Sequence, residues 1–358
     1  MSNLLFSEFT LGPLTLKNRV VMAPMTRSRS PGNVPGELVA EYYAQRADAG
    51  LIITEGTSPS PDGVGYARIP GIYNDAQQAA WKRVTDAVHA RGGRIFVQLM
   101  HTGRTGHQAN LPEGARVLGP SAIANPGKMW TDAHGEVPFE APTPMTEADI
   151  EKAITGYVEA SKRAIAAGFD GVELHGANGY LIDQFLNTAS NQRTDRWGGS
   201  VEGRVRFAAE VARRVAAAIG GERLGMRISP AGGNGGMQPD ADTAQIYLRL
   251  MQELKTAGLV YVHVVDHSAM GSPKLDEALF KGMREAFGGP FIVVGNFDAA
   301  RAEAALESKR GELAAFGRPF ISNPDLVTKL KTGAALRRYD VKTFYTPGPV
   351  GYTDYPMN

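Results

Sequence analysis

Eight short apolar segments, each followed by a stretch with helical periodicity, most constrain what this 358-residue chain can fold into. Short, nearly continuous apolar runs bounded by turn residues predict strands that are buried on both faces of a sheet. The predicted strands lie at residues 19–22, 51–54, 94–99, 171–175, 224–228, 261–265, 291–294 and 313–316. The predicted helices lie at residues 36–49, 75–91, 147–167, 201–219, 243–257, 273–287, 298–307 and 324–332.

This alternation predicts an α/β fold with a parallel sheet, and eight such units can close into a (β/α)8 TIM barrel, which commonly needs about 250 residues. A doubly wound open sheet is the alternative. The barrel is favoured because no Gly-x-Gly-x-x-Gly turn follows any predicted strand. Two alternating segments, residues 4–9 and 14–17, flank Gly12 and Pro13 and predict a β-hairpin that plugs the N-terminal end of the barrel.

The connection after the third strand is too long for an ordinary loop. It runs from Leu99 to Glu147 through many glycines and prolines, and structureless connections beyond about 15 residues are usually functional lids or disordered. Because it follows a strand, residues 103–145 are expected to form a capping subdomain over the C-terminal mouth of one barrel domain that spans residues 1–358. The Tyr-, Gly- and Pro-rich tail after Arg338 is expected to fold over the same mouth.

Composition excludes several classes of protein and site. A formal net charge of +1 and the absence of a basic run argue against binding to nucleic acid or a membrane surface. The chain has no cysteine, which excludes disulfides, thiolate-bound metal sites and a cysteine nucleophile. His263 and His267 would not converge on a strand, so no metal site is predicted. No apolar run reaches about 18 residues, so we expect a cytoplasmic protein.

In a barrel, residues at the C-terminal ends of strands are the default site candidates. These are Thr26, Gly56, Gln98, His175, Arg227, Asn296 and Arg318. A buried arginine at the end of a strand needs an anionic partner, either a ligand or a neighbouring carboxylate. The turns Gly295-Asn296 and Gly317-Arg318 follow the last two strands and predict a phosphate cradle, with two ordinary turns as the alternative.

The stretch GVELHGANGYLIDQFLN, residues 171–187, joins a strand to a glycine-containing turn. Its His175, Asn178 and Tyr180 supply polar groups within six positions and could face one small cavity. The alternative is a loop whose polar side chains only satisfy the backbone.

Motifs along the whole chain resemble those of the Old Yellow Enzyme family of FMN-dependent ene-reductases, close to the bacterial N-ethylmaleimide and nitrate-ester reductases. The motifs are LKNRVVMAPMTRSR (16–29), GLIITEGT (50–57), QLMHTGR (98–104), HGANGYLIDQFLN (175–187), NQRTDRWGGS (191–200), VVGNF (293–297) and FGRPFISNPDL (316–326). The resemblance implies that the barrel binds FMN and is an NADPH dehydrogenase, with NADPH or NADH as the reductant. It implies a ping-pong reaction in which hydride from reduced FMN N5 and a proton from Tyr180 reduce an activated C=C bond.

The implied substrates are small activated alkenes (enones, enals, maleimides, nitroalkenes) or nitro compounds, and the implied assembly is a monomer or homodimer. The resemblance implies catalytic roles for Tyr180, His175 and Asn178. It implies FMN contacts from Pro24, Met25, Thr26, Gly56, Gln98, Arg227, Gly295, Asn296, Gly317 and Arg318. It implies substrate contacts from His175, Asn178, Tyr66, Met100 and Tyr345, although ordinary packing is an equal interpretation of Tyr66 and Tyr345.

The chain departs from the family pattern at several positions. Relatives often carry Trp at Met100 and a second His at Asn178, which puts substrate preference in doubt. The segment 191–204 is expected to be structural, with Ser200 as a helix N-cap. Two other functions remain open at this point: a different FMN barrel oxidoreductase, of the hydroxy-acid oxidase or dihydroorotate dehydrogenase type, and a non-catalytic barrel that binds a phosphorylated ligand.

Overall fold

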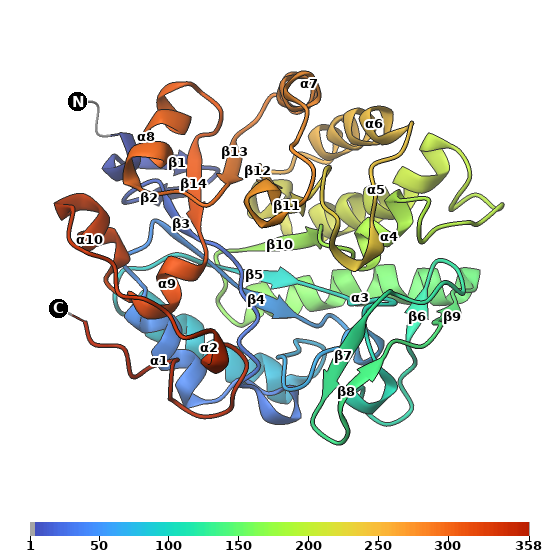
Figure 1. Ribbon diagram of the computed structural model, residues 1–358, viewed down its shortest axis with the longest axis horizontal. Helices are drawn as coiled ribbons and strands as arrows, with labels where there is room; N and C mark the ends of the chain where they lie inside the picture. The colour runs from blue at the N-terminus through green and yellow to red at the C-terminus, as the bar shows by residue number, and fades with distance from the viewer. Residues whose placement is uncertain (1–3, 358) are drawn as a thin grey trace.

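The centre of the molecule is a closed barrel of eight parallel strands (Figure 1). The computed structural model describes residues 4–357, except for the side chain of Met270. Around the barrel the strands are β3 (Val20–Met22), β4 (Leu51–Thr57), β5 (Ile95–Leu99), β10 (Gly171–Gly176), β11 (Leu224–Ile228), β12 (Tyr261–Val265), β13 (Phe291–Val294) and β14 (Leu313–Phe316). The sheet closes because β14 pairs with β3. The predicted barrel is confirmed, and the open-sheet alternative is wrong.

Helices follow the barrel strands and cover the outside of the sheet (Figure 1). They are α1 (Glu37–Gln45), α2 (Asp75–His89), α3 (Glu147–Ala166), α5 (Val201–Ile219), α6 (Thr243–Thr256), α7 (Glu277–Phe287), α8 (Ala299–Glu307) and α10 (Leu326–Thr332), with two short helices, α4 (Leu181–Leu186) and α9 (Arg318–Ser322). Ser200 caps α5 as predicted, because its side chain accepts a hydrogen bond from the Gly203 N–H. Within residues 4–357, no helix has the length and apolar character needed to cross a membrane.

The N-terminal hairpin closes one end of the barrel. Strands β1 (Phe9–Leu11) and β2 (Leu14–Leu16) pair antiparallel, and Leu11 and Leu16 are buried against barrel-interior residues. The prediction of an extended segment at 4–9 is wrong in its first half, where Leu4–Phe6 forms a 3-10 helix. The backbone N–H groups of Leu4 and Leu5 donate to the carboxylate of Glu303, which holds this turn in place.

Two aromatic rings fill the barrel interior above the hairpin. Phe96 and Tyr261 are buried, and their ring centroids lie 6.0 Å apart. Glycines on the neighbouring strands make room for them: a Cβ on Gly171 would lie 2.3 Å from the Phe96 ring, and one on Gly225 would lie 2.2 Å from the Tyr261 ring. The glycines are therefore required by packing.

The long insertion after β5 contains four short strands. These are β6 (Leu118–Gly119), β7 (Lys128–Thr131), β8 (Gly135–Pro138) and β9 (Thr143–Pro144). Strands β7 and β8 form an antiparallel hairpin that projects beside the barrel (Figure 1). Short 3-10 helices lie at Pro31–Asn33, Pro61–Gly63, Gln108–Asn110, Gly221–Arg223, Asn234–Gly236, Ser268–Met270 and Val341–Thr343.

Two arginines that follow β3 hold the C-terminal segment against the barrel. Arg27 donates to the carbonyl oxygens of Phe344 and Gly351 at 3.2 and 2.8 Å. Arg29 donates to the carbonyl oxygens of Thr343 and Val350 at 2.9 and 3.0 Å. The segment is thus anchored mainly through its main chain.

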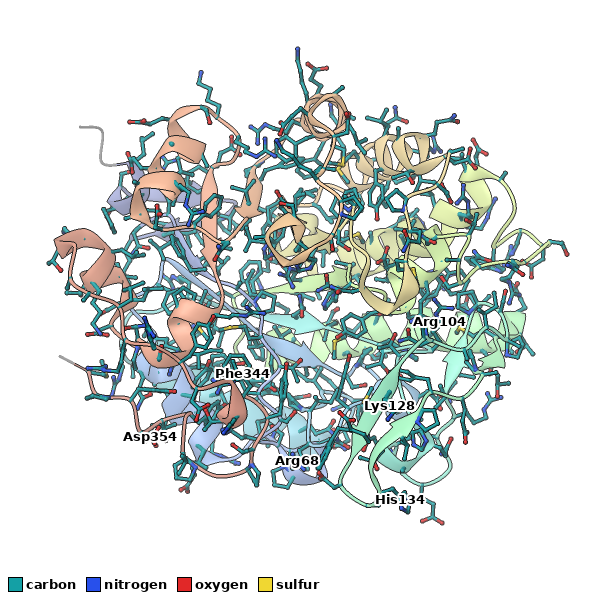
Figure 2. All side chains as sticks on the ribbon, viewed as in Figure 1. Arg68, Arg104, Lys128, His134, Phe344 and Asp354 are labelled. Carbon is teal, nitrogen blue, oxygen red and sulfur yellow. The ribbon has the colours of Figure 1, made fainter. Side chains whose placement is uncertain are left out.

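A third arginine joins the C-terminal segment to the insertion. Arg68 lies between Phe344 of the segment and Lys128 of the β7–β8 hairpin (Figure 2). Its Nη2 donates to the Tyr345 carbonyl at 2.9 Å, and its Nη1 pairs with Asp132 of the hairpin. Two segments that are far apart in sequence are therefore connected through one side chain.

The packing around Tyr261 makes Gly225→Ala destabilising. The added methyl group would overlap the buried ring, and overpacking of a core typically costs about 1–3 kcal/mol. The matched control is Gly156→Ala in α3, where the new Cβ would lie 3.5 Å from its nearest neighbours. That change should stabilise the helix by roughly 0.5–1 kcal/mol. Urea unfolding of both variants checks this; a Gly225→Ala variant as stable as the unmodified chain would contradict it.

Candidate active site

A cavity of about 220 Å³ lies at the carboxyl ends of the barrel strands. Most residues that the sequence analysis singled out meet in its wall: Pro24, Met25, Thr26, Gly56, Gln98, Met100, His175, Asn178, Tyr180, Arg227, Arg318 and Tyr345. The wall also contains Ile321 and Phe344, which were not predicted. Residues from distant parts of the chain converge here because parallel strands bring their carboxyl ends to one face of the barrel.

A second cavity, of about 210 Å³, adjoins the first and shares Arg227 and Arg318 with it. Predicted residues Asn296 and Gly317 line it, together with Asp266 and His267. Gly295 is not part of either wall. A Cβ on Gly295 or Gly317 would meet no atom closer than 3.8 or 3.7 Å, respectively. The main chain at both turns is therefore open to close approach by a ligand.

A buried carboxylate, Glu173, organises the barrel interior below the first cavity. It accepts hydrogen bonds from Gln98 Nε2 at 2.8 Å and from the Tyr261 hydroxyl at 3.0 Å, and it pairs with His263 Nδ1 at 2.9 Å. Burial alone would raise the pKa of Glu173, but His263, Arg227 and Gln98 hold it below its ordinary value. Gln98 thus gives its amide nitrogen to Glu173, which leaves its oxygen as the acceptor that can face the cavity.

Arg227 is a buried cation at the end of β11. The residue is 7% exposed, and its Nε has no hydrogen-bond partner among the residues that the structure describes. Burial lowers the pKa of Arg227, whereas the charge of Glu173 raises it. Of the two partners that the sequence left open, a neighbouring carboxylate therefore acts only through its field, and a ligand remains the candidate for direct contact.

His175 presents a neutral donor. Its Nδ1 accepts from the Ala177 N–H at 3.3 Å, so the proton of the neutral ring lies on Nε2. Burial, followed by the positive charge of Arg227, lowers the pKa of His175 well below its ordinary value. The imidazole therefore donates a hydrogen bond without carrying a charge.

The turn after β10 is held in a left-handed conformation. Asn178 and Gly179 have φ values of 60° and 78°, a region that asparagine and glycine tolerate best. The Asn178 N–H donates to Ser229 Oγ at 2.9 Å, and the Gly179 N–H donates to Asp183 Oδ2 at 2.9 Å. These contacts aim the Asn178 side chain at the cavity. Its Oδ1 lies 2.7 Å from His267 Nε2.

Tyr180 is kept protonated beside a second phenol. Its hydroxyl lies 3.0 Å from that of Tyr66, and its ring packs edge-on against His175. Burial raises the pKa of Tyr180 above its ordinary value, while the hydrogen bond from Tyr66 opposes the shift. Tyr66 itself does not line the first cavity but a third one, of about 340 Å³, which it shares with Tyr180, Asn178 and Lys128.

Met100 is buried and fills space that Gly56 leaves open. A Cβ on Gly56 would lie 2.5 Å from the Met100 sulfur. The flexible thioether therefore forms part of the cavity wall, and the absent side chain at position 56 is what admits it.

Several residues of the site were missed from the sequence. Glu173 was treated only as part of a strand, and its partners lie on other strands. His267 follows β12 and was considered only as a metal ligand, because the list of strand-end candidates contained no residue from this strand. Applying the same strand-end rule to residues 261–265 would have found it.

The residues present fit FMN. A buried guanidinium whose Nε lacks a partner suits a ring that becomes anionic on reduction, and two open glycine turns beside Arg318 suit a phosphate. The two cavities share Arg227 and Arg318, so one ligand with a ring at one end and a phosphate at the other can occupy both. Among the described residues, no cluster of three metal-ligating side chains occurs.

Comparison with known proteins agrees with this geometry. The profile of the NADH:flavin oxidoreductase / NADH oxidase family matches residues 4–337. A 12-oxophytodienoate reductase 7 from Oryza sativa subsp. japonica is 42% identical over 376 residues, covering 99% of this chain and 94% of the relative. A probable flavin mononucleotide-dependent alkene reductase from Leishmania infantum is 39% identical over 360 residues, covering 99% of this chain and 98% of the relative.

Solved structures show the same fold over the full length. Morphinone reductase superposes with a TM-score of 0.95 at 44% identity, covering 99% of this chain and 96% of that one. The old yellow enzyme homologue from Zymomonas mobilis superposes with a TM-score of 0.93 at 39% identity, covering 99% of both chains.

The carboxyl that supports the turn makes stability depend on pH. Burial raises the pKa of Asp183 to about 7, so the folded state binds a proton that the unfolded state releases between pH 4 and 7. The associated stability is present at low pH and lost as the pH rises. We expect the unfolding free energy of the unmodified chain, relative to that of Asp183→Asn, to fall by on the order of 3 kcal/mol between pH 5 and pH 8.

In Asp183→Asn the amide oxygen can still accept from Gly179, but the titrating proton is gone. The unmodified chain should therefore lose stability relative to this variant as the pH rises. The matched control is Asp86→Asn, an exposed residue of α2, whose pH dependence should follow that of the unmodified chain. A stability difference between Asp183→Asn and the unmodified chain that is the same at both pH values would refute the prediction.

Proposed function

Since this chain belongs to the NADH:flavin oxidoreductase / NADH oxidase family, with Old Yellow Enzyme homologues among its relatives, we propose that it reduces activated C=C bonds in the cavity at the barrel mouth. The chain is an FMN-dependent ene-reductase that uses NAD(P)H. The hydroxy-acid oxidase, dihydroorotate dehydrogenase and ligand-storage alternatives are not favoured. The convergence of His175, Asn178 and Tyr180 on one cavity beside the unpaired Arg227 carries the proposal.

In this proposal the FMN ring contacts Pro24, Met25, Thr26, Gly56, Gln98 and Arg227, and its phosphate contacts Gly295, Asn296, Gly317 and Arg318. When bound, FMN supplies the hydride that is drawn from NAD(P)H and delivered to the alkene. Arg227 contributes a positive charge that lies on a barrel strand and that the charge of Glu173 favours through space, so the proposed stabilisation needs little reorganisation.

His175 and Asn178 hold the oxygen of the substrate's carbonyl or nitro group. His175 and Asn178 both line the cavity, where the Nε2–H of the imidazole and the side-chain N–H of the Asn178 amide are the groups that can donate. Negative charge grows on this oxygen as the double bond is reduced, so donors already in position stabilise the transition state more than the ground state. One such donor typically contributes about 3 kcal/mol.

Tyr180 delivers the proton to the alkene carbon next to the activating group. Its hydroxyl stays protonated at neutral pH because burial raises its pKa. The 3.0 Å contact with Tyr66 offers a route by which the phenol regains its proton from the third cavity. Tyr66 thereby has a role in proton supply as well as in shaping the site.

The substrates we propose are small enones, enals, maleimides and nitroalkenes, with nitro compounds as a further class. Met100, Phe344 and Tyr345 line the cavity beside the donor pair and set its shape. Residues 103–145 serve as a cap in this proposal, because Lys128 and Phe139 contribute to the third cavity next to Tyr180.

A visible spectrum of the purified protein tests the cofactor assignment. Protein supplied with FMN should retain yellow colour after desalting, and anaerobic NADPH or NADH should bleach it. Adding cyclohexenone should restore the colour. Protein that remains colourless after incubation with FMN would overturn the proposal, and colour that neither nucleotide bleaches would favour a binding function.

Tyr180→Phe separates proton delivery from cofactor reduction. Loss of a positioned general acid costs about 10²–10⁴-fold in rate, so reoxidation by cyclohexenone should slow by that factor while bleaching by NADPH stays within about twofold. Stopped-flow absorbance measures both rates. Tyr339→Phe, outside the cavity wall, is the control and should leave both rates unchanged. Unaltered reoxidation in Tyr180→Phe would remove the proton-donor role.

A further inference from the structure

His267 connects the two cavities of the site. It follows β12 and lines the second cavity, where Asn296 and Arg318 also lie. Its Nε2 is 2.7 Å from Oδ1 of Asn178, which lines the first cavity. None of the roles implied by the family resemblance uses this residue, although it contacts one of the two proposed oxygen donors.

The contact determines which end of the Asn178 amide faces the substrate. An amide can present either its oxygen or its N–H group to a cavity, and only the N–H group donates. Here Oδ1 receives His267 at 2.7 Å and Asn234 Nδ2 at 3.5 Å. No residue within 4–357 accepts a hydrogen bond from Nδ2. The amide nitrogen is therefore left for the cavity.

We propose that His267 is a positioning residue for ene-reduction, which donates from Nε2 to Asn178 Oδ1 and thereby keeps the Asn178 N–H group turned toward the substrate oxygen. This inference rests on the proposed function. It also explains how a chain with Asn178 in place of a second histidine maintains a donor at this position.

The protonation state of His267 agrees with this role. Burial, followed by the positive charge of Arg227, lowers its pKa to about 4, so the ring is neutral near pH 7 and carries one proton. Because Oδ1 can only accept, that proton lies on Nε2. Rotating the Asn178 amide by half a turn would place its N–H group against the Nε2–H of His267. The neutral ring could remove this repulsion only by moving its proton to Nδ1.

The backbone cannot fix the amide by itself. Ser229 holds the Asn178 N–H and Asp183 holds that of Gly179, which sets the direction of the side chain but not the rotation of its terminal amide. That last rotation depends on what contacts Oδ1, and the contact with His267 is the shorter of the two. Removing the His267 side chain should therefore allow the terminal amide of Asn178 to rotate.

A double-mutant cycle between His267 and Asn178 tests the proposal. His267→Leu, Asn178→Ala and the double variant are compared with the unmodified holoenzyme. Two quantities are measured per bound FMN: the Kd of 4-hydroxybenzaldehyde by calorimetry, and kcat/KM for cyclohexenone. His267→Leu should weaken both by about tenfold, the effect of one misdirected hydrogen bond. In the Asn178→Ala background it should change neither by more than about twofold.

Two further variants complete the experiment. His267→Gln keeps a side-chain N–H donor and should retain most of the affinity, whereas His134→Leu, on an exposed turn of the β7–β8 hairpin, should match the unmodified enzyme. If His267→Leu fails to retain FMN, His267→Ala replaces it in the same cycle. Equal losses in both backgrounds, or no loss in His267→Leu, would overturn the inference. Absence of cyclohexenone turnover in the unmodified enzyme would instead count against the proposed function.

Discussion

The site depends on one buried carboxylate inside the barrel. Glu173 on β10 accepts hydrogen bonds from Gln98 on β5 and from Tyr261 on β12, and it pairs with His263 on β12. Its negative charge offsets the positive charge of Arg227 on β11. Taking either charge out of water alone would cost several kcal/mol. Because Glu173 balances Arg227 through space rather than by a direct bond, the guanidinium stays charged and keeps its donors for a ligand. Glu173 also orients the Gln98 amide by accepting its N–H group. One carboxylate therefore balances the charge of Arg227 and sets which atom of Gln98 faces a ligand.

Burial beside Arg227 also sets the protonation of the remaining groups. Burial, followed by the charge of Arg227, lowers the pKa values of His175 and His267, whereas burial raises the pKa of Tyr180 although the charge of Arg227 opposes that shift. At neutral pH the site therefore holds two neutral imidazoles and an intact phenol near Arg227. Neutral groups of this kind can stabilise developing negative charge with hydrogen bonds and release one proton, without adding a positive charge that would repel Arg227.

The barrel could be predicted because its strands are continuous apolar runs, whose boundaries agree with the structure to within a few residues. Two features differed for local reasons: residues 4–6 form a 3-10 helix held by Glu303, and β4 continues to Thr57 through an irregular register after Ile53.

Most strand-end candidates met in one cavity because topology alone places them there. The partners of Glu173 could not be predicted, since they lie 75 to 90 positions away and no local pattern links them. His267 was considered only as a metal ligand, and of the tail only Tyr345 was named as a contact, because the sequence does not show which side chains of an irregular segment turn toward the mouth.

The way Arg27 and Arg29 hold the C-terminal segment has a consequence for substitutions in it. They bind mostly carbonyl oxygens, which every residue carries, so these hydrogen bonds do not depend on which side chain stands at position 344. Phe344 and Tyr345 reach the cavity from this anchored main chain. The anchors at these two positions are main-chain carbonyl oxygens, so a substitution at either position can reshape the cavity wall while those hydrogen bonds are retained.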